Sequence, residues 1–94
     1  LSFRRHDPGR YPAVDLCYGA GRAGGTMPAV LNAANETAVY AFLDRTIGYM
    51  DIVRITEETM SRVGTVSDPG IDDIFESHRE AVATALSIIK EKRL

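Results

Sequence analysis

The sequence predicts an all-α fold, a small four-helix bundle-like domain, and three observations lead to this fold class. A chain of 94 residues with 45% apolar and 26% charged residues has the composition of one globular domain. Apolar residues recur at helical spacing in four segments, at about 12–23, 26–44, 51–63 and 71–92. Neither an internal repeat nor an alternating strand pattern competes with these four helices.

Residues 1–10 mix charge with Pro8 and Gly9 without any period, which is typical of an extended linker. The chain also opens with Leu1 instead of Met, as in a processed protein or the end of a longer one. We therefore expect a linker over 1–10, to which we assign no chemistry, and a helical domain over 11–94.

The helix expected at 12–23 begins with Pro12, whose φ is preset for a first helical turn, and ends at Gly24-Gly25. Gly19 and Gly21 within it each cost about 1 kcal/mol relative to Ala, so it is the weakest of the four.

The helix expected at 26–44 begins at Thr26, whose side chain we expect to cap it, and it tolerates Pro28 in its first turn. It is apolar over most of its circumference, which is typical of a helix surrounded by others. Its many alanines would let neighbouring backbones approach closely.

The helix expected at 51–63 has a marked beginning. Asp51 is the expected N-cap, and Met50 and Ile55 stand where a hydrophobic staple would place them. Glu58 precedes Arg62 by four residues, the favourable order for a helical ion pair.

A turn at Asp68-Pro69-Gly70 precedes the helix expected at 71–92. Its residues at helical spacing form a continuous stripe that we expect to be buried, with Phe75 in the core: Ile71, Ile74, Phe75, His78, Val82, Ala85, Leu86 and Ile89.

Composition excludes several classes of function. Eleven Lys and Arg against thirteen Asp and Glu give a net charge of −2, so nucleic acid is not an expected partner. Every apolar run is shorter than the ~20 residues of a membrane span, so no membrane association is expected. The single Cys17 can close no internal disulfide, which suits a reducing compartment, and we expect a cytoplasmic protein.

The segment Gly19-Ala20-Gly21-Arg22-Ala23-Gly24 matches the dinucleotide-binding pattern G-x-G-x-x-G, with Asp44 twenty residues further on. That site needs a strand before it and a helix that opens at the second glycine. A helix from Gly21 would contain Pro28 in its interior, at a cost of about 3 kcal/mol. We therefore expect no cofactor binding by this loop.

Four other polar residues stand out within the expected helices. His78 has no second ligand or base at a suitable spacing, so a hydrogen-bonded histidine in the core or an interface is expected. Asn32 and Asn35 are poor helix formers that share one face, and Glu36 is adjacent. We expect Asn32, Asn35 and Glu36 to serve structure and interdomain contact, and we identify no catalytic, cofactor-binding or metal-binding residue.

Several blocks of the chain together resemble one known family. They are Arg10-Tyr11-Pro12, the run from Gly24 to Glu36 (GGTMPAVLNAANE), Ala41-Phe42-Leu43, and Ile47 to Ile52 (IGYMDI). The sequence resembles the C-terminal helical domain of the 1-deoxy-D-xylulose 5-phosphate reductoisomerase family. His78 departs from the acidic residue that this family pattern leads us to expect, and Gly19 and Gly21 depart from its more helical first segment.

The resemblance implies a parent enzyme of non-mevalonate isoprenoid biosynthesis, an oxidoreductase and isomerase. It would rearrange its substrate and reduce it with NADPH, aided by Mg²⁺ or Mn²⁺, to 2-C-methyl-D-erythritol 4-phosphate. The motifs that hold cofactor, metal and phosphate in that family have no matching positions here, so the chain alone is expected to be inactive. The resemblance also implies an upstream catalytic domain, packing of this domain against the central catalytic domain, and a homodimer formed mainly through the central domains.

Two alternatives stay open. The same fold can serve as a stand-alone helical protein-interaction module, without enzymatic partners. A small nucleotide-binding protein that uses Gly19 to Gly24 is the other.

Overall fold

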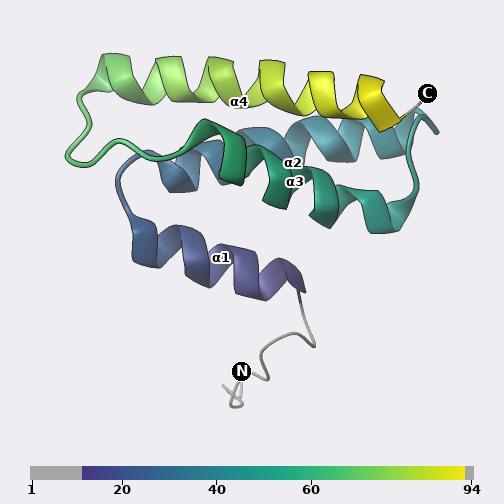
Figure 1. Ribbon diagram of the computed structural model, residues 1–94, viewed down its shortest axis with the longest axis horizontal. Helices are drawn as coiled ribbons and strands as arrows, with labels where there is room; N and C mark the ends of the chain where they lie inside the picture. The colour runs from purple at the N-terminus through teal and green to yellow at the C-terminus, as the bar shows by residue number, and fades with distance from the viewer. Residues whose placement is uncertain (1–11, 93–94) are drawn as a thin grey trace.

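The computed structural model describes residues 12–92, and these form four helices without a strand (Figure 1). The helices are α1 (Pro12–Ala23), α2 (Met27–Leu43), α3 (Tyr49–Val63) and α4 (Ile71–Lys92). The predicted all-α, four-helix fold class is thus confirmed. The linker predicted over 1–10 lies outside the described residues.

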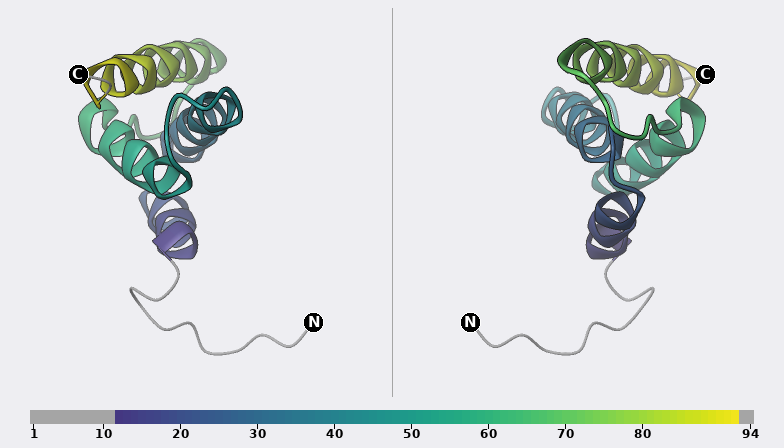
Figure 2. Two further views of the ribbon diagram at one scale, coloured as in Figure 1. Left: turned by 90° about the vertical axis from the view of Figure 1, so that its right-hand side faces the viewer. Right: turned by 90° about the vertical axis from the view of Figure 1, so that its left-hand side faces the viewer.

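The helix α2 is the centre of the fold, because it packs against each of the other three helices. It forms the body of the molecule together with α3 and α4. The helix α1 packs against α2 and α3 on the side away from α4, so α1 and α4 lie on opposite sides of the molecule (Figure 2).

The core depends on small side chains. One cluster gathers Ala20, Met27, Val30, Ala33 and Ala81, and the other gathers Ala38, Ile55, Ala85, Ile88 and Ile89. Ile55 and Ile88 are fully buried, which contributes about 1.5–3 kcal/mol each. The alanines of α2 face those of α4. Their small side chains let the two helices pack closely, as the composition of α2 predicts.

The turn between α1 and α2 is fastened to the loop between α3 and α4. Gly24 and Gly25 have φ angles of 65° and 54°, which favour glycine. A Cβ on Gly25 would overlap the carbonyl oxygen of Val66 and lie 2.9 Å from its carbonyl carbon. The Thr26 N–H donates to that oxygen at 3.1 Å, and the Val66 N–H donates to Thr26 Oγ1 at 2.8 Å.

The prediction that the Thr26 side chain caps α2 is therefore wrong, although the helix does begin directly after Thr26. The Thr26 backbone is helical, with φ −84° and ψ −6°, and its hydroxyl makes no cap hydrogen bond. Its side chain is fully buried and is used to hold a loop forty residues away. We call this pair of hydrogen bonds the Thr26–Val66 clamp.

The beginning of α3 differs from the prediction by two residues. Gly48 is the N-cap, and its N–H donates to the carboxylate of Asp51, the third helical residue, at 2.9 Å. Asp51 is therefore not the N-cap, and Met50 is 71% exposed, so it forms no staple. Ile47 and Ile52 occupy the staple positions instead, and both pack against the second core cluster.

The buried face of α4 also differs from the prediction. Ser77, Ala81, Ala85, Ile88 and Ile89 are buried, so only Ala85 and Ile89 of the expected stripe lie in the core. Phe75 is 66% exposed, and its predicted place in the core is wrong. The small residues of α4 fit against the alanines of α2, and the larger apolar side chains remain outside.

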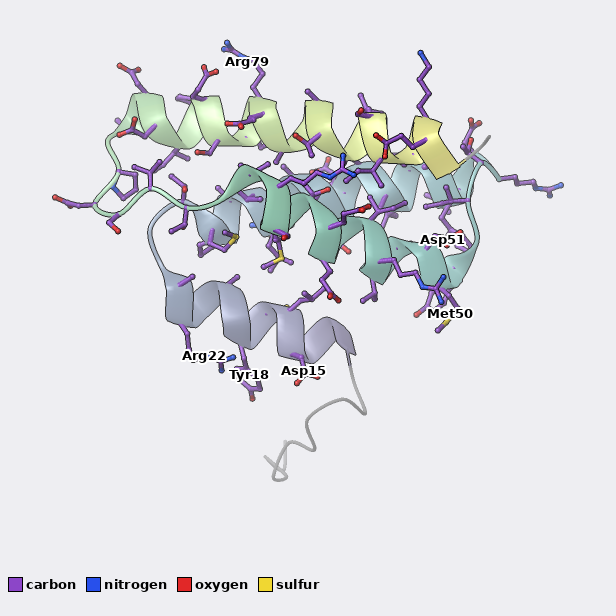
Figure 3. All side chains as sticks on the ribbon, viewed as in Figure 1. Asp15, Tyr18, Arg22, Met50, Asp51 and Arg79 are labelled. Carbon is purple, nitrogen blue, oxygen red and sulfur yellow. The ribbon has the colours of Figure 1, made fainter. Side chains whose placement is uncertain are left out.

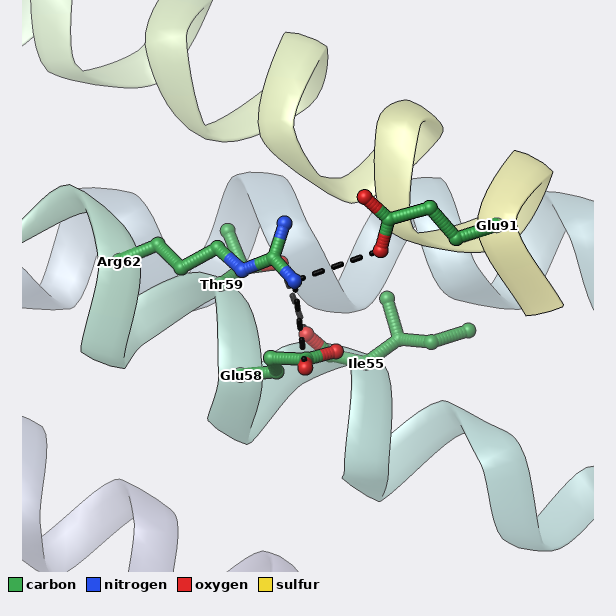
Figure 4. Close-up of polar contacts among 5 residues, drawn as sticks. All are labelled: Ile55, Glu58, Thr59, Arg62 and Glu91. Atoms are coloured by element: carbon green, nitrogen blue, oxygen red, sulfur yellow. Dashed lines mark hydrogen bonds and ion pairs between the residues drawn. The ribbon is translucent and has the colours of Figure 1, made fainter.

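Polar contacts join α3 to α4 at the surface. Arg62 forms ion pairs of 3.3 Å with Glu58, as predicted, and with Glu91 on α4 (Figure 4). All three side chains are substantially exposed, so each pair contributes at most about 1 kcal/mol. The buried Thr59 donates its hydroxyl to the carbonyl of Ile55 at 2.7 Å, so it leaves no unpaired group in the core.

Candidate functional site

Asn32 and Asn35 lie on one side of α2, at a cleft of about 190 Å³ between α1, α2 and α3. The prediction that they share a face is confirmed by this lining. We call this hollow the carboxamide cleft, and it is lined by Leu16, Cys17, Leu31, Asn32, Asn35, Val53 and Thr56.

Both carboxamides of this cleft are exposed, and neither makes a hydrogen bond to another described residue. Asn disfavours a helix interior by about 0.5 kcal/mol relative to Ala. Each carboxamide presents a carbonyl acceptor and an NH₂ group with two donors. The cleft therefore combines a small apolar floor with free donors and acceptors, a composition suited to contact with polypeptide backbone.

Glu36 lies apart from the two asparagines. It lines a second hollow of about 230 Å³ between α2 and α4, together with Tyr40, His78 and Val82. A single binding partner seated in the carboxamide cleft is therefore not positioned to contact Glu36 from the same side.

His78 is exposed on α4, at the mouth of that second hollow. It is consequently not a core histidine, although a place in an interface is compatible with its exposure. Within residues 12–92, no three His, Cys, Asp or Glu side chains gather in a way that could hold a metal ion. His78 and Glu36 on their own are two potential ligands, fewer than a protein metal site requires.

The glycine pattern at 19–24 lies within and at the end of a helix, whereas a dinucleotide site needs these glycines between a strand and the start of a helix. Gly19 and Gly21 lie inside α1, and the N–H of Gly24 donates to the carbonyl of Ala20 at 3.0 Å. The following Gly25 is covered by the backbone of Val66. The α3–α4 loop therefore occupies the space beside this turn that a bound pyrophosphate would need.

Sequence reasoning missed one surface, the outward side of α4. Ile71, Phe75 and Leu86 are 73%, 66% and 55% exposed. The predicted stripe did identify these residues, but periodicity alone does not distinguish a face buried in the domain from a face buried by a partner. None of the helices formed by the described residues combines the length and apolar character of a bilayer span.

Comparison with known proteins identifies the family. Residues 1–84 match the family described as DXP reductoisomerase C-terminal domain. The chain is 50% identical over 78 residues to the 1-deoxy-D-xylulose 5-phosphate reductoisomerase of Synechococcus sp. (strain CC9902), covering 81% of this chain and 19% of the relative. It is 45% identical over 93 residues to that of Heliobacterium modesticaldum (strain ATCC 51547 / Ice1), covering 99% and 24%.

A solved structure gives the same result. The 1-deoxy-D-xylulose 5-phosphate reductoisomerase of Zymomonas mobilis in complex with NADPH superposes with a TM-score of 0.82 and 39% identity, covering 94% of this chain and 23% of that protein. The chain thus spans about a fifth of the length of the curated relatives that it matches. The fold, the sequence match and the structural match agree, and this chain belongs to the family of DXP reductoisomerase C-terminal domains.

Proposed function

We propose that this chain is the accessory C-terminal domain of an NADPH-dependent 1-deoxy-D-xylulose 5-phosphate reductoisomerase. The parent would isomerise its substrate and reduce it to 2-C-methyl-D-erythritol 4-phosphate, in isoprenoid biosynthesis in the cytoplasm. The observation that carries this proposal is the family match over residues 1–84, together with relatives of the same name of which the match covers only 19–24%. Membership of this family disfavours a stand-alone interaction module.

In this proposal NADPH and Mg²⁺ or Mn²⁺ bind to other domains of the parent, and the 94-residue chain is inactive alone. The residues described here do not suit either group. The glycine turn is covered by Val66, and His78 and Glu36 are too few to hold a metal. We accordingly assign no catalytic, cofactor or metal role to any of these residues.

The carboxamide cleft is the surface that we assign to the parent's central catalytic domain. Asn32 and Asn35 stand in the middle of a helix that would be more stable with Ala at either position, and they make no hydrogen bond within the described part of the domain. Contact with the backbone of a neighbouring domain would use their donors and acceptors. Glu36 would serve a separate interdomain contact on the α2–α4 side.

The parent would be a homodimer joined mainly through its central domains, so this domain would be peripheral to the dimer interface. The helix α1, the first described element, forms one wall of the carboxamide cleft.

A binding experiment in trans tests this assignment. The Synechococcus relative is produced without its C-terminal fifth, and the 94-residue chain is titrated into it by calorimetry. We expect binding that weakens at least about tenfold when Asn32→Ala and Asn35→Ala are combined, since each lost hydrogen bond is worth about 1 kcal/mol. Thermal unfolding of the free variant should show equal or greater stability, because both side chains are exposed and Ala favours the helix.

Glu57→Ala is the matched control, because Glu57 is an exposed polar residue on α3 that does not line the cleft. Its binding should equal that of the unaltered chain. Unchanged binding by the Asn32→Ala and Asn35→Ala variant would contradict the assignment of the cleft, and no binding by any form would contradict the proposed accessory role.

A further inference from the structure

The carboxamide cleft is lined by uncharged side chains. Among the described residues that line it there is no Asp, Glu, Lys, Arg or His. The helix α1 contributes to this neutrality, because Asp15, Tyr18 and Arg22 point away from α2 and α3, on the outer side of α1 (Figure 3). A charged group that entered the cleft would lose water without meeting an opposite charge on the lining residues, which is unfavourable. The occupant that fits is therefore electrically neutral.

The floor of the cleft is small and apolar. Its volume of about 190 Å³ is below the roughly 300–1,000 Å³ of pockets that enclose cofactors and other small ligands. Leu31 and Val53 are half-buried in it, and the buried Thr56 already donates its hydroxyl to the carbonyl of Ile52 at 2.8 Å. A polar group on this floor would find few partners, so an apolar side chain suits it best.

The two carboxamides at the cleft suit a polypeptide backbone in an extended conformation. Asn32 and Asn35 are about 4.5 Å apart along the axis of α2, and each can donate and accept at the same time. The interior of a helix pairs its own N–H and C=O groups and offers none to a neighbour. An extended segment presents these groups along its edge, and its side chains alternate between its two faces. It can therefore bind both carboxamides and direct a side chain to the floor.

We propose that the carboxamide cleft binds an extended segment of the parent's central catalytic domain. The segment places one apolar side chain on the floor and its peptide groups against Asn32 and Asn35. The identity of the partner rests on the proposed function, whereas its extended conformation and its neutral character follow from the cleft itself.

Isosteric substitution tests the contact with peptide groups. Chains with Asn32→Asp or Asn35→Asp are titrated into the Synechococcus relative that lacks its C-terminal fifth. We expect each variant to bind at least about tenfold more weakly, because a carboxylate repels a carbonyl oxygen and cannot donate to it. The matched control Ser61→Asp adds the same charge at an exposed position on α3 that does not line the cleft, and it should bind like the unaltered chain.

Amide hydrogen exchange of the truncated relative, resolved to single residues, tests the conformation of the bound segment. Some amides should be protected by the unaltered chain but not by the Asn32→Asp and Asn35→Asp double variant. We expect these amides to belong to alternate residues of one segment, because an extended backbone presents every second residue to the same side.

Cys17 reports whether the cleft is occupied, because it is the single cysteine of the chain, is exposed and lines the cleft. Its alkylation by iodoacetamide is followed by the mass of the chain. We expect a reaction at least about tenfold slower in the complex than in the free chain, because reactivity requires access to the thiol. In a Cys17→Ser background, the control Glu57→Cys should react equally fast in both states.

Two kinds of failure give different results. Binding that leaves Cys17 unprotected, that the Asp variants do not weaken, or that protects amides three or four residues apart, as a helix would, overturns the extended occupant and leaves the accessory role standing. A Cys17 that already reacts slowly in the free chain would mean that the chain fills its own cleft, and it equally overturns the proposal. Absence of binding by every form overturns the proposed function and this occupant together.

Discussion

Replacing Gly25 with Ala probes the contact that joins the α1–α2 turn to the α3–α4 loop. The two glycines of this turn offer an unusually close comparison, because both have positive φ angles. An added Cβ on Gly24 meets no atom within 4 Å, whereas one on Gly25 would overlap the carbonyl oxygen of Val66. The variants Gly24→Ala and Gly25→Ala therefore differ in sterics and share the same conformational penalty.

The expected magnitudes follow from these two contributions. A left-handed backbone costs a non-glycine residue about 1–2 kcal/mol, and this is all that Gly24→Ala should lose. Gly25→Ala must in addition displace Val66, which breaks both hydrogen bonds of the Thr26–Val66 clamp at about 1 kcal/mol each. We expect it to lose about 3–4 kcal/mol in total, or a fall in melting temperature of at least about 12 °C.

Urea unfolding followed by circular dichroism at 222 nm measures both variants. We expect Gly25→Ala to be less stable than Gly24→Ala by about 2 kcal/mol, with similar m-values. Equal stability of the two variants would refute it, because the carbonyl of Val66 would then not approach Gly25 closely enough to exclude a methyl group.

Three further variants test local features by the same unfolding measurement. Arg45 has a φ of 60° in the turn that ends α2, so Arg45→Gly should stabilise the domain by about 1 kcal/mol, and a loss of stability would indicate a contact made by its side chain. Gly21 is helical with open space at its Cβ, so Gly21→Ala should stabilise by about 0.5–1 kcal/mol, and destabilisation would mean that α1 is not regular there. Phe75→Ala should cost less than about 1 kcal/mol in dilute solution, whereas the fully buried Ile55→Ala should cost about 2–5 kcal/mol, and equal costs would place Phe75 in the core.

The positions of the helices were predictable from the sequence because they depend on local chemistry. Gly24-Gly25, Gly48 and Gly70 interrupt helical spacing, and each interruption coincides with a turn. The first residues of α3 and α4 follow one local rule: the N–H of Gly48 binds Asp51, and the N–H of Gly70 binds Asp73 at 3.0 Å. The N-cap of α3 was predicted at Asp51, three residues after the actual N-cap Gly48, because aspartate is favourable both at the N-cap and at the third helical position.

The buried face of α4 was not predictable in the same way. Its core-facing residues include Ser77 and Ala81, which a search for large apolar side chains overlooks. They are buried because the alanines of α2 leave room only for small neighbours, which is a property of two helices packed together. Phe75 belongs to an equally regular stripe, but none of the four described helices covers its side chain, which is 66% exposed.

The candidate site was only partly predictable for a similar reason. The spacing of Asn32 and Asn35 on one face of a helix could be derived from sequence, whereas the separation of Glu36 onto the α2–α4 side depends on where α1 and α4 pack. The role of Thr26 likewise depends on a loop forty residues away.

NADPH oxidation in the presence of 1-deoxy-D-xylulose 5-phosphate and Mg²⁺ tests the proposed accessory role most directly. The 94-residue chain, the Synechococcus relative without its C-terminal fifth, and their mixture are assayed side by side. We expect that the chain alone oxidises no NADPH and that the mixture is more active than the truncated relative. Turnover by the chain alone would contradict the accessory role. So would a truncated relative that is fully active by itself and whose activity does not change when the chain is added.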